Sequence, residues 1–194
     1  MQKSLKRLKK QSSNMDNYKR TKLLTLAREA IALAFENKKP DLEFYKDVDE
    51  SKGCFVTLHR KKQLRGCIGY IQAEPLYELV PRAAVAAALY DDRFKPVTKD
   101  ELELITIEIS LLTEPKQITG DSEDFPKNII IGEDGLIIQS REGSGLLLPQ
   151  VAAENFWDAH QFLNALCQKA GVSFQAWKEK HTKIFKFQTE IFRE

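Results

Sequence analysis

The spacing of hydrophobic residues predicts the main helices of this chain. Over residues 17–37 the apolar side chains recur every three or four positions, which places them on one face of an amphipathic helix. Pro75 precedes a second predicted helix, at about residues 76–90, whose middle reads AAVAAALY and whose small side chains permit close packing. A third helix is expected over about residues 158–170, with Gly171 as its stop signal.

Strands are predicted where apolar and polar residues alternate or where short apolar runs occur. GCFVTLH and LRGCIGYI are two such runs joined by the polar letters RKKQ, a pattern typical of a β-hairpin. ITIEISL, at Ile105–Leu111, alternates with period two, and KIFKFQTEIF is expected as one last strand. The polar residues 113–128 predict a long surface loop. Because hairpins outnumber β-α-β units, the predicted fold class is α+β with a largely antiparallel sheet flanked by helices.

Length and charge narrow the function classes. A chain of 194 residues forms one domain, or two intimate subdomains, and buries a real core. The formal charge is +2, but residues 1–14 carry five basic residues and no acid, so the remaining chain is net negative. We therefore expect a basic, disordered arm over residues 1–16 and a single domain over 17–194. An acidic body also argues against nucleic-acid binding.

Targeting and metal-binding signals are missing from the sequence. No run of eighteen apolar residues and no apolar segment after the N-terminal charges occurs, so we expect neither a transmembrane helix nor a secretory signal. The three cysteines are odd in number and lie in apolar segments, which favours a reducing cytoplasm over a disulfide framework. Without CxxC or HxxxH pairs, we predict no metal site and no cofactor.

The stretch QLRGCIGY puts two glycines and a cysteine into a predicted strand. Strand alternation places Leu64, Gly66, Ile68 and Tyr70 on one face, and Arg65, Cys67 and Gly69 on the other. We expect the first face to enter the core, with Gly66 as a flat spot against the alanine-rich helix. The second face places a guanidinium beside a thiol. Packing alone does not explain why these residues occur together.

Two interpretations of that second face stay open. In the first, Arg65 favours the thiolate of Cys67, the nucleophilic form of the side chain, and Gly69 leaves room for a ligand. His59, on the neighbouring predicted strand, is then a candidate base. In the second, the cysteine is buried and structural, and the glycines permit close packing or a bulge.

Two further segments carry candidate chemistry. SREGSGLLLPQ resembles a phosphate-cradling loop in its glycines, but it lacks Walker spacing, and a plain hairpin turn is favoured. YDDRFKP, at Tyr90–Pro96, places two acids, an arginine and an aromatic at a predicted helix end. A salt-bridged loop anchor is favoured there over a metal-binding carboxylate pair.

Several of these segments together resemble one known family. They are LRGCIG at Leu64–Gly69, DDRF.P at Asp91–Pro96, DGLII at Asp134–Ile138, SGLLLPQVA.E..WD from Ser144 to Asp158, and KAG at Lys169–Gly171. Their order and identity resemble the AMMECR domain family, in its microbial branch, protein A of the AmmeMemoRadiSam system. The resemblance covers the chain from about residue 17 to its end.

The resemblance implies an α+β fold of two unequal subdomains with a cleft between them. It also implies association with a Memo-like protein and a radical S-adenosylmethionine enzyme. The hypothesis is an enzyme or enzyme-partner subunit of a modification pathway that uses the LRGCIG strand at the cleft. A non-catalytic protein-binding adaptor is the alternative, and an RNA-binding factor ranks last. Whether the chain is itself an enzyme stays open at this point.

That hypothesis assigns candidate roles to individual residues. The candidate catalytic residues are Cys67 and Arg65. The candidate substrate-binding residues are Gly66, Gly69, Asp91, Arg93 and Ser144.

Overall fold

A computed structural model describes residues 15–194, and they divide into two compact units. Unit 1 is made of the described residues up to Ser110 together with Glu190–Glu194, and unit 2 is Leu111–Thr189. The predicted basic arm falls on residues 1–14, outside the described residues, apart from its last two positions. Met15 is buried, and the Asp16 side chain caps the first helix by accepting a hydrogen bond from the Lys19 N–H.

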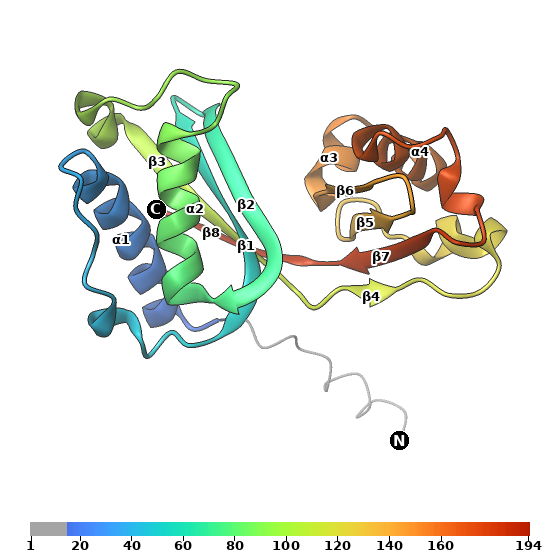
Figure 1. Cartoon of the computed structure of the whole chain (residues 1–194), viewed down its shortest axis with the longest axis horizontal. Helices are drawn as coiled ribbons and strands as arrows, with labels where there is room; N and C mark the ends of the chain where they lie inside the picture. The colour runs from blue at the N-terminus through green and yellow to red at the C-terminus, as the bar shows by residue number, and fades with distance from the viewer. Residues whose placement is uncertain (1–14) are drawn as a thin grey trace, which may run out of the picture. The chain divides into compact units, whose positions relative to one another are not determined.

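Unit 1 packs two helices against a four-stranded sheet of order β2-β1-β3-β8 (Figure 1). Its elements are α1 (Asn17–Ala34), η1 (Leu42–Tyr45), β1 (Ser51–Arg60), β2 (Gln63–Pro75), α2 (Leu76–Leu89), η2 (Lys99–Leu104), β3 (Ile105–Leu112) and β8 (Thr189–Arg193). Helix α2 contacts α1 on one side and the β1–β2 hairpin on the other. Among the helices of residues 15–194, none combines the length and the apolar character needed to cross a membrane.

Unit 2 has its own sheet, of order β4-β7-β5-β6, with antiparallel pairing throughout. Its elements are β4 (Lys116–Gln117), η3 (Ser122–Asn128), β5 (Gly135–Gln139), β6 (Ser144–Leu147), α3 (Pro149–Glu154), α4 (Ala159–Ala170), η4 (Ala176–Lys178) and β7 (Lys183–Phe187). Helix α4 begins at a capping box between Asp158 and Gln161 and ends at Gly171, whose φ is 68°. It covers β5 and β6 over a core that includes Leu136, Phe162 and Trp177.

The α+β class and the antiparallel sheets are confirmed, and three local predictions are corrected. The predicted loop at 113–128 contains β4 and η3. The predicted last strand is two strands, since Gln188 interrupts it by donating its N–H to Thr113 Oγ1 at 2.8 Å. The hairpin loop is tighter than RKKQ: Arg60 pairs with Gln63, so only Lys61 and Lys62 form the turn.

The predicted faces of β2 are partly corrected by a bulge. Leu58 pairs with Gly66 and His59 with Leu64, so Arg65 is an extra residue without a partner on β1. Leu64 therefore lies opposite His59 and not on the Gly66 face, and it is 44% exposed. Gly66 does pack on the alanine-rich helix: a Cβ added there would lie 2.2 Å from the carbonyl oxygen of Ala87.

We expect Gly66→Ala to lower the free energy of unfolding by about 1–3 kcal/mol, because the obstructing atom belongs to the α2 backbone. Chemical denaturation followed by circular dichroism measures this change. Ala73→Ser, at an exposed position of the same strand, serves as control and should stay within about 0.5 kcal/mol of the native chain. Equal stability of Gly66→Ala and the native chain would contradict the close approach of β2 and α2.

Candidate functional site

Strand β2 lies at the edge of its sheet, so one side of its backbone has no neighbouring strand. At Cys67 two side chains from the loop after α2 occupy that side. Asp91 Oδ2 accepts a hydrogen bond from the Cys67 N–H at 2.8 Å, and Arg93 Nη2 donates one to the Cys67 carbonyl at 3.1 Å. These are the two contacts that a paired strand would make. We call this arrangement the Asp91–Arg93 clamp.

The clamp is itself held together by charge-assisted hydrogen bonds. Arg93 donates to both carboxylate oxygens of Asp91, from Nε at 2.9 Å and from Nη2 at 2.7 Å. These bonds, together with the backbone N–H groups of Cys67 and Arg93, lower the pKa of Asp91 to about 2 despite burial of its side chain. Asp91 is thus an ionised carboxylate whose oxygens are already bonded. Within residues 15–194 no group of three or more His, Cys, Asp or Glu side chains is placed to hold a metal ion.

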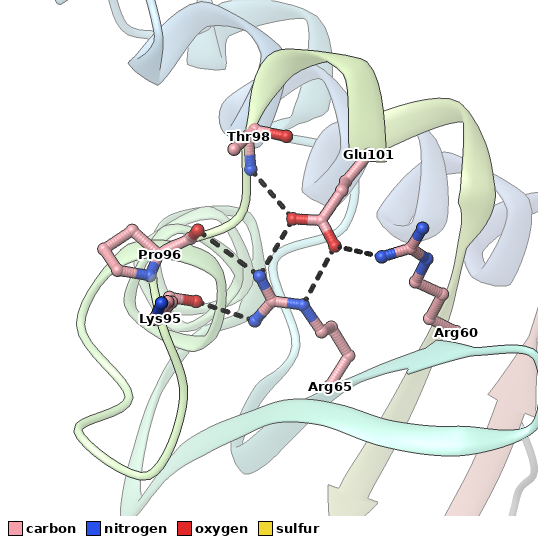
Figure 2. A network of polar contacts seen from close by, with 6 residues as sticks. All are labelled: Arg60, Arg65, Lys95, Pro96, Thr98 and Glu101. Atoms are coloured by element: carbon pink, nitrogen blue, oxygen red, sulfur yellow. Dashed lines mark hydrogen bonds and ion pairs between the residues drawn. The ribbon is translucent and has the colours of Figure 1, made fainter.

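Arg65 makes a second anchor between the hairpin and the same loop (Figure 2). Its guanidinium donates to both carboxylate oxygens of Glu101, at 3.2 and 2.9 Å. It also donates to the carbonyls of Lys95 at 2.8 Å and Pro96 at 3.3 Å. With its side chain only 15% exposed, Arg65 is committed to holding the loop in place.

Glu101 is the centre of this second anchor. Besides Arg65, it accepts from Arg60 Nη1 at 2.8 Å and from the Thr98 N–H at 3.2 Å (Figure 2). The hydrogen bonds from Arg65 are the main reason that the pKa of Glu101 falls to about 2. Thr98 and Glu101 form the capping box at the start of η2, so the residue that caps this helix also holds Arg65.

The Cys67 thiol is half-buried and accepts a hydrogen bond from Thr57 Oγ1 at 3.2 Å. Burial raises the pKa of Cys67; the Thr57 hydrogen bond and the charge of Arg93 oppose this rise without overcoming it. At neutral pH the group is therefore a thiol. The cation that acts on it is Arg93, because Arg65 is bound to Glu101.

Two other titratable side chains lie on the sheet near this thiol. His59 follows Thr57 by two positions on β1, so the two side chains share a face. Its Nε2 atom is buried without a hydrogen-bond partner and lies 4.0 Å from Glu108 Oε1. The charge of Glu108 also acts on Cys67, raising its pKa.

The remaining candidates are placed as follows. A Cβ added at Gly69 would lie 2.3 Å from the Phe55 ring, so that ring occupies the space the glycine leaves. Ser144 opens β6 in unit 2 and is exposed; a Cβ added at the following Gly145 would lie 3.0 Å from Ala170. That glycine serves close packing of β6 on α4. In unit 1, Cys67, Asp91 and Arg93 are hydrogen-bonded to one another, and Arg65 binds the same loop through separate contacts. Ser144 belongs to unit 2.

Two residues of the site were missed in the sequence. Glu101 was not among the candidates, because its contact with Arg65 spans 36 positions of the sequence. Tyr90 was part of the YDDRFKP segment, but its 73% exposure beside the clamp depends on how α2 ends. An aromatic at a helix end next to an acid-arginine pair was the available signal.

The sequence and the fold of this chain are both similar to those of known proteins. The AMMECR1 family model matches residues 24–192. Protein TV1384 of Thermoplasma volcanium is 44% identical over 179 residues, which cover 89% of this chain and 88% of that protein. Protein PF1979 of Pyrococcus furiosus is 42% identical over 182 residues, covering 89% and 86%. The crystal structure of uncharacterized protein PH0010 from Pyrococcus horikoshii matches with a TM-score of 0.85 and 39% identity, over 93% of each chain.

The lowered pKa values of Asp91 and Glu101 predict a pH dependence of unit 1. Both carboxylates have folded pKa values of about 2, below their ordinary values of 3.8 and 4.5. Their stabilisation, on the order of 2 kcal/mol each, is therefore complete above about pH 4.5 and is lost as the pH falls towards 2. Asp91→Asn combined with Glu101→Gln should lower stability at pH 7 and flatten its decline between pH 4.5 and 2.

Urea unfolding at a series of pH values, followed by far-ultraviolet circular dichroism, measures this effect. Trp157 and Trp177 are the two tryptophans of the chain and both lie in unit 2, so their fluorescence reports that unit separately. The fluorescence transition should be much less affected by the two substitutions. An unchanged pH slope in the doubly substituted protein would show that the two anchors do not stabilise unit 1.

Proposed function

This chain belongs to the AMMECR1 family, and from that premise we propose that it is the partner-binding subunit of a cytoplasmic modification pathway. Its partners in the proposal are a Memo-like protein and a radical S-adenosylmethionine enzyme, as the motif resemblance implies. The binding role is supported by the contacts that the polar side chains of LRGCIG and DDRF.P already make within unit 1. Arg65 and Asp91 hold the loop after α2 against β2, which leaves them little capacity to bind a substrate.

The observation that carries the proposal is the pair of side chains presented by this fixed loop. Tyr90, directly before the clamp, is 73% exposed. The Arg93 side chain is 53% exposed, and its Nη1 makes no hydrogen bond to any residue of 15–194. Tyrosine and arginine dominate the energetic centres of protein interfaces, and a loop held in advance loses less entropy on binding. A rigid Tyr90–Arg93 surface is therefore suited to protein recognition.

We expect Tyr90→Ala to weaken binding to the Memo-like protein or the radical enzyme at least about tenfold, since it removes an exposed anchor without touching the clamp. Isothermal titration calorimetry with the purified proteins measures the dissociation constants. Phe44→Ala is the matched control, because Phe44 is 71% exposed on η1 of the same unit.

Binding of neither protein by the native chain would overturn the proposed function. An equal loss in Tyr90→Ala and Phe44→Ala would remove the Tyr90–Arg93 surface as the binding site.

Catalysis through Cys67 is the second candidate function, and one observation favours it. Cys54 and Cys167 are fully buried, whereas Cys67 is half-buried. Cys67 also lies close enough to Glu108 for the charge of that carboxylate to raise the pKa of the thiol. A thiol with a raised pKa needs a neighbouring base to become a nucleophile. His59, with its unpaired Nε2, is the side chain of this face that is suited to that role.

A thiol reagent such as Ellman's reagent tests this second candidate. We expect one thiol per native chain to react, more slowly at pH 7 than free cysteine, because the pKa of Cys67 is raised. The rate should increase with pH, and all three thiols should react after unfolding. Cys67→Ser should abolish the native reaction.

A native reaction faster than that of free cysteine at pH 7 would contradict the raised pKa and favour catalysis. The complete absence of labelling before unfolding would remove Cys67 as a nucleophile.

A further inference from the structure

The tip of the β1–β2 hairpin has a backbone that its residues do not favour. Lys61 and Lys62 form the two-residue turn, and their φ angles are 51° and 66°. A hairpin turn with positive φ at both positions strongly prefers Asn-Gly or similar pairs, because side chains with a Cβ rarely adopt this region. Turn geometry therefore does not explain the presence of two lysines at these positions. An explanation has to come from what their charged side chains do.

Both lysine side chains are exposed and uncompensated. Neither forms an ion pair or a side-chain hydrogen bond with any residue of 15–194. Arg60, directly before them, is paired with Glu101, yet its side chain is still 42% exposed. The tip thus carries two free ammonium groups next to a partly accessible guanidinium.

The loop fixed by Arg65 adds a third free cation to this end of unit 1. Lys95 is exposed, its own side chain has no ion pair among the described residues, and its carbonyl is bound by Arg65 at 2.8 Å (Figure 2). Exposed acids are also present nearby, at Asp92 in this loop and at Asp100 and Glu103 in η2. Five cations, Arg60, Lys61, Lys62, Arg65 and Lys95, still outnumber the four acids, because the fourth acid, Glu101, is shared by two arginines.

We propose that the tip residues Arg60, Lys61 and Lys62, together with Lys95, form an electrostatic contact for an acidic surface of a protein partner. This inference rests on the proposed function, since it names the chemistry of the partner that Tyr90 and Arg93 bind. Leu64 lies beside the tip and is 44% exposed, so the surface offers apolar area as well as positive charge. That mixture fits a protein face with carboxylates around an apolar patch better than a phosphate backbone.

Such a contact acts mainly on the association rate. Complementary charges at the rim of an interface steer the encounter of two proteins and lose their effect as salt screens them. The tip should therefore make association with the partner faster at low ionic strength. The dissociation rate should depend mainly on the Tyr90–Arg93 surface.

The turn allows an unusually clean experiment. Lys61→Asn with Lys62→Gly removes both charges and gives the turn the residues it prefers, so the melting temperature should stay equal or rise by about 2–4 °C. Association with the Memo-like protein or the radical enzyme, measured by stopped flow, should slow about tenfold at low salt and lose much of its salt dependence. Lys61→Asp with Lys62→Gly keeps the turn chemistry, adds a negative charge and should slow association further.

Two controls separate this contact from general charge effects. Lys38→Asn with Lys39→Asn removes two adjacent exposed lysines from the same unit and should leave the association rate unchanged. A melting temperature at or above that of the native chain shows that the tip variants are folded.

Unchanged association rates in both tip variants, with binding still weakened by Tyr90→Ala, would overturn this inference and leave the proposed function standing. Binding of neither protein by the native chain would instead overturn the proposed function itself. If a short single-stranded RNA binds the native chain and loses affinity in the tip variants, the tip contacts phosphate and the inference is also wrong.

Discussion

The arrangement of unit 1 around its candidate site depends on how the free backbone of Cys67 is satisfied. A residue in an edge strand offers an N–H and a carbonyl to solvent or to another chain. Here Asp91 and Arg93 take both groups, so the strand edge is closed at the point where it would otherwise be open to pairing. Because Arg93 also donates two hydrogen bonds to the Asp91 carboxylate, the loop after α2 has little freedom. Its next residues then reach Arg65 through their carbonyls.

This dependence explains why LRGCIG and DDRF.P occur together in one chain. Gly66 admits the α2 backbone, Gly69 admits the Phe55 ring, and the backbone of Cys67 receives the clamp. The two motifs are the two halves of one contact, 24 positions apart in sequence. The motif residues that bind one another have a structural role. The residues that stay exposed beside this contact are the ones available to a partner.

Periodicity in the sequence was sufficient for the regular elements. It predicted α1, α2 and α4, the β1–β2 hairpin and β3, and it predicted that Gly66 faces the alanine-rich helix. Periodicity did not predict the bulge at Arg65. This side chain binds Glu101 and the loop after α2, and those contacts are distant in sequence. The break at Gln188 likewise depends on Thr113, which lies 75 positions away.

For the site, the sequence identified the residues better than their contacts. Arg65, Cys67, Asp91 and Arg93 were all named as candidates, and all four take part in the contacts that fix the loop after α2 on β2. Which arginine acts on the thiol was not predictable, because the bulge redirects Arg65 towards Glu101. Exposure at Tyr90 was equally hidden, since it depends on the end of α2 and on the clamp together.

The division of the chain also has a consequence for its synthesis. Unit 2 is inserted between Ser110 and Glu190, and the chain passes out along β3 and returns along β8, its neighbour in the sheet. At about 5–20 residues per second, the ribosome needs several seconds to deliver the segment that separates them. During that time β3, an isoleucine-rich strand, has one backbone edge without its neighbour β8 on the nascent chain. Unit 1 therefore completes its sheet last, although most of its residues are made first.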